Sequence, residues 1–513
     1  MEASASTSTA RRLRAFRRWM RDHGVVCSDA LRLDAAEDGG GGVYVRALAA
    51  LREGDLVATI PRGACLTPRT SGAAEAIEAA ELGGPLALAV AVMYERARGA
   101  ESPWDAYLRL IPEREPVPLV WPADEAERLL AGTELDKAVK LIYLAMFGSL
   151  ELQLQIVKQD RQFICEDWKE CIEPLILSGE LEVDPDDFSL ENYFSAKSLL
   201  SSRSFRIDSY HGSGMVPLAD LFNHKTGGEH VHFTSVLEAS DSDSEDGEDP
   251  NNASADEQST IENSADIPSG DDDEDLEMIV VRDVNEGEEV FNTYGTMGNA
   301  ALLHRYGFTE MDNSYDIVNI DLALVTKWCS SKYSRRYARA RVSLWHNLGY
   351  SGCTSQDADY FEISYDGEPQ LELLILLYII SLKSDAYDKL ASVAHDLIGD
   401  DEVDSISSVL KVVRVTSSNQ HPDISGLEKL PDVKKLLLNE SVCSALVSLV
   451  DMRESLYGSN TLEDDRQKLQ ACSSVNERNL YHSLVLRVSE RTILHKLKKH
   501  ASSWSKTKKR KQL

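Results

Sequence analysis

Long apolar runs are missing from this sequence. The longest largely apolar stretch, residues 371–382, has 12 residues and still includes Glu372 and Ser381. A helix that crosses a lipid bilayer needs about 20 predominantly apolar residues. This stretch therefore predicts a buried helix of a globular domain and not a membrane span.

Paired cysteines are missing as well. The chain has eight cysteines, none of them in a C-x-x-C pair and none with the spacing of a zinc site. No signal peptide precedes them, so we expect the reduced thiols of an intracellular protein and no metal centre.

Positive charge is scarce. The chain has 54 Lys and Arg against 85 Asp and Glu, which gives a formal net charge of −31. Such a balance argues against a general role in binding nucleic acids or anionic membranes. The imbalance is concentrated, because residues 238–277 contain 17 acidic residues and no Lys or Arg. At the other extreme, residues 491–513 contain nine Lys or Arg and no acidic residue.

The acidic stretch 238–277 is composed mainly of Asp, Glu, Ser and Asn. It offers little apolar surface to offset the entropy of ordering a chain, so we predict a disordered insertion. The alternative is that the stretch binds a basic partner. The basic tail at 501–513 is compatible with a nuclear address or a nucleic-acid contact, or with a solvated chain end.

Strand and helix patterns alternate along the chain. Residues 43–61 combine β-prone runs with a Glu-Gly-Asp turn, and residues 278–290 repeat this pattern with Glu-Gly-Glu. Residues 72–196 are rich in Ala and Leu and predict helices, among them 138–157, broken up by prolines. Beyond residue 321 the pattern is nearly all helical. The order predicts an α+β protein.

The first residues allow two interpretations. Phe16, Trp19 and Met20 have helical spacing and predict a folded helix. The Ser-, Thr- and Arg-rich start also faintly resembles a transit peptide. We favour the folded helix and expect a nuclear or cytosolic protein over a plastid one.

Two groups of polar and aromatic residues flank the acidic insertion. The first consists of "SRSF" at 202–205 and "VPLADLFNH" at 216–224, and the second is "FNTYGTMGNAALLHRYGF" at 291–308. Long loops cost little additional free energy to close. We therefore expect the insertion to loop out and the two groups to fold against each other.

Together these motifs resemble the SET-domain lysine methyltransferases of the Rubisco large-subunit methyltransferase group, and most of all its nuclear members. The resemblance extends from about residue 16 to 497 and includes the spacing of Phe16, Trp19 and Gly24. It implies a β-rich SET domain split by a helical insertion and followed by an all-helical substrate-binding domain. The implied boundaries are 10–70 and 197–315 for the SET domain, 71–196 for the helical insertion, 320–500 for the helical domain and 501–513 for the tail.

The resemblance also implies S-adenosylmethionine as cofactor and a protein lysine as acceptor. Asn223 would offer its amide to the cofactor and His224 its backbone, Arg203 would face the cofactor carboxylate, and Ser202 would contribute a backbone carbonyl. Asp220 would shape both the cofactor and the lysine sites. The alternatives are that Asn223 caps a helix, His224 packs in the core, Arg203 forms an ion pair with Asp220 or another acid, and Asp220 fixes a turn.

Tyr294 is the residue that the resemblance makes catalytic, since its hydroxyl would point at the transferring methyl or the lysine nitrogen and orient the amine. The resemblance also places Tyr294 among the cofactor-binding residues. Tyr306, also assigned to catalysis, and Phe308 would line the lysine channel together with Phe205. Plain core packing is the alternative for these rings, and a strand-ending turn is the alternative for Tyr294. The family's Gly-x-Gly cofactor loop is replaced by a run of four glycines, from which we assign Gly41 and Gly42 to the cofactor.

Other function classes stay open at this point. A SET-type module without turnover could act by binding alone, and the acidic stretch could make the chain a histone-binding or interaction protein. The acceptor could also be histidine. We expect a lysine-bearing histone, ribosomal or other nuclear protein as partner, and no membrane or direct nucleic-acid role.

Overall fold

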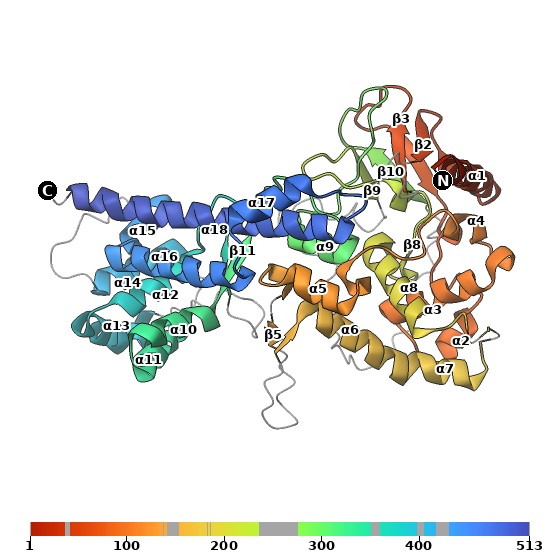
Figure 1. Cartoon of the computed structure of the whole chain (residues 1–513). Helices are drawn as coiled ribbons and strands as arrows, with labels where there is room; N and C mark the ends of the chain where they lie inside the picture. Colours follow the sequence, from red (N-terminus) through yellow and green to blue (C-terminus); the bar gives the residue numbers. More distant parts are fainter. Residues whose placement is uncertain are drawn as a thin grey trace, which may run out of the picture. The chain divides into compact units, whose positions relative to one another are not determined.

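The computed structural model describes residues 2–35, 42–136, 138–140, 153–181, 183–184, 186–234, 275–349, 360–397, 405–416 and 430–511. The chain forms two compact units (Figure 1). Unit 1 consists of Met1–Glu115 and Ile164–Gly295, and unit 2 of Pro116–Phe163 and Thr296–Leu513. Both units are built from two separate segments of the chain. The domain boundaries implied by the resemblance remain a prediction.

Unit 1 contains the β-rich part of the chain. Its strands are β1 (Val26–Cys27), β2 (Leu31–Ala35), β3 (Val43–Ala47), β4 (Leu56–Ile60), β7 (Ser204–Asp208), β8 (Gly212–Met215), β9 (Val231–Thr234) and β10 (Leu276–Val280). A four-stranded antiparallel sheet has the order β1-β4-β10-β9, and two hairpins pair β2 with β3 and β7 with β8.

The register of the four-stranded sheet connects distant parts of the sequence. In β10, Met278 lies opposite Ala58 of β4 on one side and opposite Phe233 of β9 on the other. Leu276, Met278 and Val280 alternate with less buried residues, so one face of β10 packs into the core. Strands on the two sides of the acidic insertion thus lie next to each other, as predicted.

The structure corrects the end of the predicted disordered stretch. Leu276 is fully buried, and Glu277 is paired with Thr59 and Thr234 within β10. Apolar residues at every second position make this segment a strand in spite of its acidic neighbours. Residues 235–274, which hold the rest of the prediction, lie outside the described residues.

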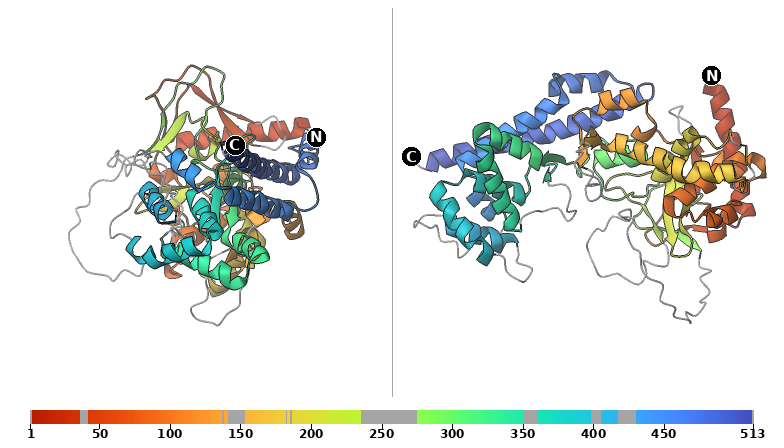
Figure 2. Two further views of the ribbon diagram at one scale, coloured as in Figure 1. Left: turned by 90° about the vertical axis from the view of Figure 1, so that its left-hand side faces the viewer. Right: turned by 90° about the horizontal axis from the view of Figure 1, so that it is seen from below.

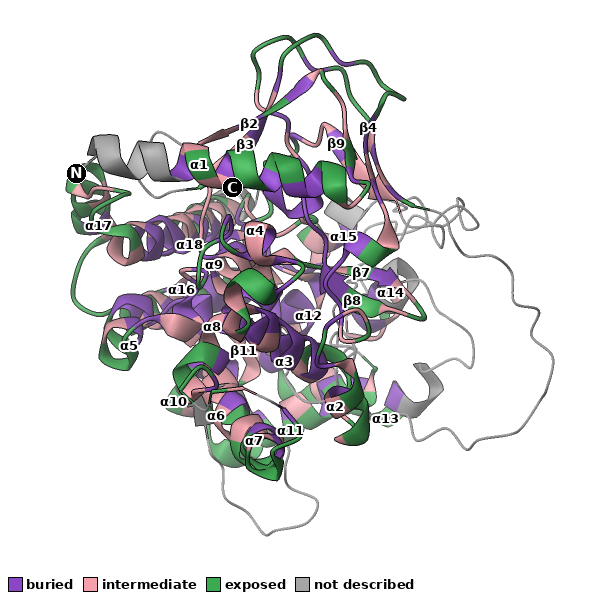
Figure 3. Cartoon of the chain, turned by 90° about the vertical axis from the view of Figure 1, so that its right-hand side faces the viewer, coloured by how far each residue is buried: buried purple, intermediate pink, exposed green. Residues whose placement is uncertain are grey.

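Unit 1 also contains helices. They are α1 (Glu2–Asp22), α2 (Ala74–Ala79), α3 (Gly84–Ala97), α4 (Asp105–Leu108), α7 (Glu173–Ser178) and α8 (Leu190–Arg203). Along α1, buried and exposed residues alternate with helical period (Figure 3), and Phe16 is fully buried. The predicted folded N-terminal helix is confirmed. The Phe16 ring packs near Trp19 and Tyr107 at centroid distances of 5.7 and 6.0 Å.

Unit 2 is mostly helical. Its elements are α5 (Ala123–Leu130), β5 (Ala138–Lys140), β6 (Gln153–Gln155), α9 (Asn299–Tyr306), β11 (Val318–Asp321), α10 (Leu322–Lys332), α11 (Arg335–Asn347), β12 (Tyr360–Ile363), α12 (Leu371–Ser381), α13 (Ser384–Leu397), α14 (Ser405–Thr416), α15 (Leu430–Leu437), α16 (Glu440–Glu454), α17 (Leu462–Ala471) and α18 (Arg478–Lys511). Helix α6 (Ile156–Asp167) continues from unit 2 into unit 1.

The core of unit 2 surrounds α12, which is buried on nearly all sides. This helix is the apolar stretch at 371–382, and its predicted burial is confirmed. The long helix α18 runs past the helical group (Figure 2) and includes the basic tail up to Lys511. Among the residues that the structure describes, none of the helices is long and apolar enough to cross a membrane.

One helix prediction is wrong. The stretch 138–157 begins with β5, which pairs with β6 so that Val139 lies opposite Leu154. A helix, α6, begins only at Ile156. The strand pairing satisfies the same backbone groups that a helix would, so the Ala and Leu content alone was a weak guide. Residues 141–152 lie outside the described residues.

Candidate active site

The two motif groups meet in unit 1. A short helical turn, η6 (Ala219–Leu221), leads into Phe222, Asn223 and His224. The Asn292 N–H donates to the Asn223 carbonyl at 2.9 Å, and the Tyr294 N–H donates to His224 Nδ1 at 2.9 Å. The predicted contact between the segments on either side of the insertion is therefore confirmed.

The phenol of Tyr294 is held in place from two sides. Its hydroxyl donates to the Phe222 carbonyl at 3.0 Å, and its ring stacks on the His224 ring with centroids 5.1 Å apart. Because the hydroxyl proton points at a carbonyl, the lone pairs of the phenol oxygen face other directions and can accept a hydrogen bond. An amine with an N–H directed at this oxygen would have a defined orientation.

A sharp backbone turn precedes η6. Leu218 has φ +82° and ψ −49°, although its side chain is fully buried. A positive φ is rare for residues other than glycine and costs free energy that the surrounding packing must supply. The turn leads the chain from the end of β8 into η6, which contains Asp220 and is followed by Asn223.

A buried network joins Arg203 to two carboxylates. Arg203 Nε donates to Glu115 Oε1 at 2.6 Å, and Nη1 donates to Asp220 Oδ2 at 3.2 Å and to the Asp220 carbonyl at 2.9 Å. The Tyr107 hydroxyl donates to the same Oδ2 at 3.0 Å. The ion pair with Asp220, which the sequence left as an alternative for Arg203, is thus present. A role toward the cofactor carboxylate stays a prediction.

The charges of this network do not balance. Glu115 and Asp220 share one guanidinium, and the Asp220 side chain has no exposed surface. Burial raises the pKa of Asp220 to about 6, against the lowering effects of Arg203 and the Tyr107 hydroxyl. Asp220 Oδ1 is buried and makes no hydrogen bond with the described residues.

The remaining predicted residues of unit 1 have mixed surroundings. Asn223 is exposed, and its amide donates to Glu289 Oε1 at 2.7 Å. His224 is buried with Nε2 3.1 Å from the Thr226 hydroxyl. Its ring therefore packs in the core, as the alternative held, and a backbone contact with the cofactor stays a prediction. Ser202 lies at the end of α8, and Phe205 in β7 packs on Phe233 at a centroid distance of 5.0 Å.

Other predicted residues fall elsewhere. Gly42 is exposed just before β3, and Gly41 lies outside the described residues. Tyr306, the last residue of α9, and Phe308 belong to unit 2, where their rings lie 6.3 Å apart. Their roles as walls of a lysine channel stay predictions.

Sequence reasoning missed Tyr107, Glu115 and Glu289. Each contacts a predicted residue from a remote position in the chain, 66 to 113 residues away. Nothing in the local pattern around these three residues signals such a contact. The aromatic spacing of the N-terminal helix, which packs Phe16 against Tyr107, is the nearest hint.

Donors, acceptors and charge in the motif region suit S-adenosylmethionine. Its sulfonium and ammonium groups outweigh its carboxylate by one positive charge, whereas Arg203, Asp220 and Glu115 together have one excess negative charge when ionised. The unpartnered Asp220 Oδ1 is a free acceptor in the same network. No group of three His, Cys, Asp or Glu among the described residues is placed to hold a metal ion.

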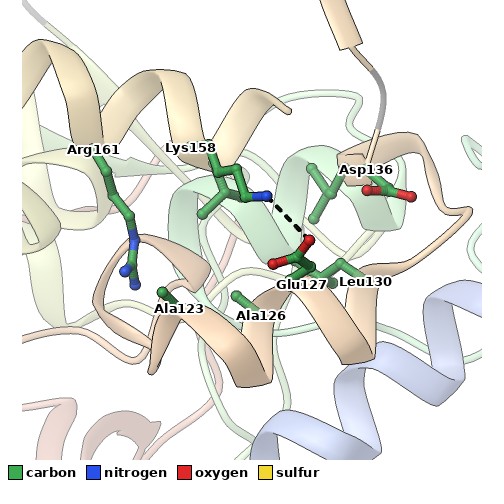
Figure 4. Close-up of a pocket in the computed structure, with 9 residues that line it drawn as sticks. Ala123, Ala126, Glu127, Leu130, Asp136, Lys158 and Arg161 are labelled. Atoms are coloured by element: carbon green, nitrogen blue, oxygen red, sulfur yellow. Dashed lines mark ion pairs between the residues drawn. The ribbon is translucent and has the colours of Figure 1, made fainter. Parts of the chain in front are cut away.

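A small pocket elsewhere does not compete as a cofactor site. It lies in unit 2 between α5 and α6, next to the Lys158–Glu127 ion pair of 3.2 Å (Figure 4). Its volume of about 20 Å³ has room for roughly one water molecule. None of the predicted site residues lines it.

Comparison with solved structures identifies the fold. The SET domain of LSMT bound to lysine and AdoHcy superposes with a TM-score of 0.60 at 18% identity, covering 96% of this chain and 91% of that one. Rubisco LSMT bound to AdoMet gives a TM-score of 0.58 at 18% identity, covering 96% and 92%. The chain has the SET-domain fold of the Rubisco methyltransferase group. The predicted α+β fold class is confirmed.

Sequence comparison agrees with this group. Ribosomal lysine N-methyltransferase 3 of Saccharomyces cerevisiae is 28% identical over 375 residues, covering 62% of this chain and 65% of the yeast protein. N-lysine methyltransferase setd6 of Salmo salar is 26% identical over 469 residues, covering 87% of both chains. The SETD6 protein of Mus musculus is 28% identical, and the chain spans 57% of its length. No protein-family model matches the chain. The resemblance to SET-domain lysine methyltransferases of this group is confirmed, and the particular likeness to its nuclear members stays a prediction.

Proposed function

We propose that this chain is an S-adenosylmethionine-dependent N-methyltransferase that acts on a lysine side chain of a protein substrate. The observation that carries the proposal is the anchored phenol of Tyr294, held between the Phe222 carbonyl and the His224 ring. The SET-domain relatives named as N-lysine methyltransferases support it.

Lysine must lose its proton before it can attack. The pKa of a free lysine is about 10.4, so only about one in two thousand is neutral at pH 7. A desolvated site close to a positive sulfonium disfavours the ammonium form, and the proton leaves to solvent before the substrate is buried. No strong base is then required of the protein.

Tyr294 would orient the amine. Its hydroxyl proton is already donated to Phe222, so the phenol oxygen accepts from an N–H of the amine and turns the nitrogen lone pair toward the methyl group. Bound cofactor supplies that methyl on a sulfonium, which becomes a neutral thioether as the N–C bond forms. Positioning of this kind accounts for a large part of the rate.

The other site residues would hold the cofactor. We assign Asn223 and His224 to its polar edges, and Arg203 with Asp220 to a fixed charged wall beside it. Because the Asn223 amide donates to Glu289, we expect that contact to be exchanged or shared when the cofactor binds. Gly42, Tyr306 and Phe308 keep their predicted roles in this proposal.

Labelled S-adenosylmethionine tests the proposal. Purified protein is incubated with fractionated nuclear and ribosomal extracts, and labelled proteins are hydrolysed so that methyl-lysine and methyl-histidine are separated. We expect methyl-lysine with the wild type, and a loss of about 10- to 100-fold in transfer for Tyr294→Phe, the effect of one lost hydrogen bond to the amine, with cofactor affinity retained. Tyr210→Phe, which removes a hydroxyl from an exposed ring, is the matched control.

The outcomes separate the rival functions. Equal labelling by wild type and Tyr294→Phe contradicts the assigned site. Cofactor binding by the wild type without transfer to any fraction favours a SET-type binding module, and methyl-histidine as sole product changes the acceptor.

A further inference from the structure

Helices α10 and α11 are unusually basic for this chain. Residues 322–347 contain six Lys or Arg and no Asp or Glu, in a protein whose net charge is −31. The six are Lys327, Lys332, Arg335, Arg336, Arg339 and Arg341. The two helices pack against each other within unit 2 (Figure 1).

Four of these residues form one exposed surface, here called the cationic face: Lys332, Arg335, Arg336 and Arg339. All four are exposed. At about 100° per residue, the three arginines fall within about 100° of the circumference of α11. The opposite side of the helix packs into the core through Ala338, Leu344 and Trp345.

The cationic face has no anionic partner within the described part of the chain. No ion pair or hydrogen bond involves its side chains there, and its one recorded contact is Lys332 over the Trp328 ring at 5.2 Å. Exposed surfaces usually mix both charges, which lowers repulsion. In contrast, residues 322–347 contain no acidic residue that could reduce the repulsion.

The arrangement lowers the stability of α11. Arg335 and Arg339 are four residues apart, where like charges repel across a helix turn. Arg335 and Arg336 occupy the first turn, which has no acidic residue, although the helix dipole favours negative side chains there. Local stability therefore does not explain these arginines, and an external anion would relieve the repulsion.

A buried cation adds to the positive field. Arg341 is 4% exposed, and its guanidinium lies between the rings of Tyr337 and Tyr387 at 4.2 and 3.9 Å. Its Nε and Nη1 make no hydrogen bond with described residues, and its Nη2 donates to the Leu382 carbonyl. No carboxylate among the described residues neutralises this charge.

We propose that the cationic face binds a short acidic segment of a partner protein. Guanidinium groups pair with carboxylates in a bidentate way, and three of the four side chains project from one side of α11. Residues 335–339 rise only about 6 Å along the helix, so an extended segment of about six residues is enough to cover them. A long polyphosphate fits poorly, because beyond this face it meets a chain of strongly negative charge.

A binding experiment with the full-length chain tests the proposal without any methyl transfer, so its result is independent of the proposed activity. Fluorescein-labelled octaglutamate is titrated at low ionic strength and its anisotropy measured. The test variant is Arg335→Glu, Arg336→Glu, Arg339→Glu. The matched control is Arg11→Glu, Arg14→Glu, Arg18→Glu, which reverses three exposed arginines of α1 and changes the net charge equally.

We expect saturable binding to the wild type and the α1 variant, and at least about tenfold weaker binding to the α11 variant. The far-UV circular dichroism of the α11 variant should match that of the wild type, which excludes loss of folding as the cause. A variant with lysine at the same three positions should retain part of the affinity, because it keeps the charge and loses the bidentate pairing. Binding should weaken as salt is raised. Equal weakening in the α1 and α11 variants, absence of binding to the wild type, or tighter binding of octauridylate would each overturn the proposal.

Discussion

Asp220 should make the stability of unit 1 depend on pH in an unusual direction. Burial raises its pKa in the folded protein to about 6 from an ordinary value of 3.8. The folded state therefore binds the proton more tightly than the unfolded chain does between these values. Stability contributed by the protonated form is complete below about pH 4 and is lost as the pH rises through about 6.

The size of the effect follows from the shift. A difference of about two pKa units corresponds to about 3 kcal/mol of opposing free energy once Asp220 is ionised in both states. About half of the 3 kcal/mol by which protonated Asp220 stabilises the fold is already lost at pH 5, so roughly 1.5 kcal/mol remains to be lost between pH 5 and pH 8. Asp220→Asn removes the titration but keeps the shape of the side chain and an acceptor for Tyr107.

Hydrogen exchange over α8, which carries Arg203, reports the opening free energy of this network. We expect the value for Asp220→Asn minus that for the wild type to increase by roughly 1.5 kcal/mol from pH 5 to pH 8. Asp22→Asn, at the exposed end of α1, should show no such trend. A flat or falling difference for Asp220→Asn would mean that Arg203 outweighs burial and would refute the reasoning.

Two further predictions concern unit 2. Gly132 has φ +78°, and a Cβ there would lie 2.4 Å from the Leu456 carbonyl oxygen. Gly132→Ala should therefore lower the free energy of unfolding, measured by urea titration, by about 3 kcal/mol or more. The control is Gly54→Ala, because Gly54 also has a positive φ but has open space around it. The pKa of His482 is lowered to about 3 by burial and by Arg478. The stability that the neutral imidazole contributes to the fold is therefore present above about pH 6.5 and falls by about 2 kcal/mol from pH 7 to pH 5. Thermal unfolding of His482→Gln should show a smaller fall over this range, and an unchanged fall would contradict the prediction.

The contact between the motif groups could be predicted from the sequence because it depends on local signals. Each group is contiguous, and the intervening composition shows that the insertion has no core of its own. The β-prone run at 278–290 predicts a strand directly after it, although the structure begins that strand two residues earlier, at Leu276. These signals predict that the two groups meet, whereas the contact of Tyr294 with His224 comes from the structure.

The partners of Arg203 could not be predicted in this way. Glu115 and Tyr107 come from a segment whose pattern is dominated by prolines and short helices, and an isolated carboxylate or phenol has no periodicity. The positive φ of Leu218 is likewise invisible, since tertiary packing and not residue type imposes it. Long-range charge pairing and backbone strain therefore had to be read from the structure.

The ion pairs of Arg203 do not compete with its proposed role beside the cofactor. A guanidinium has five N–H donors, and the bonds to Glu115 and Asp220 use only Nε and Nη1. The Nη2 group remains to donate to an incoming carboxylate, and the side chain is still 20% exposed. The two carboxylates fix the plane of the guanidinium before the ligand arrives, which reduces the entropy lost on binding. An arginine that is already paired on two sides is thus better prepared to bind a third group than one that is free to rotate.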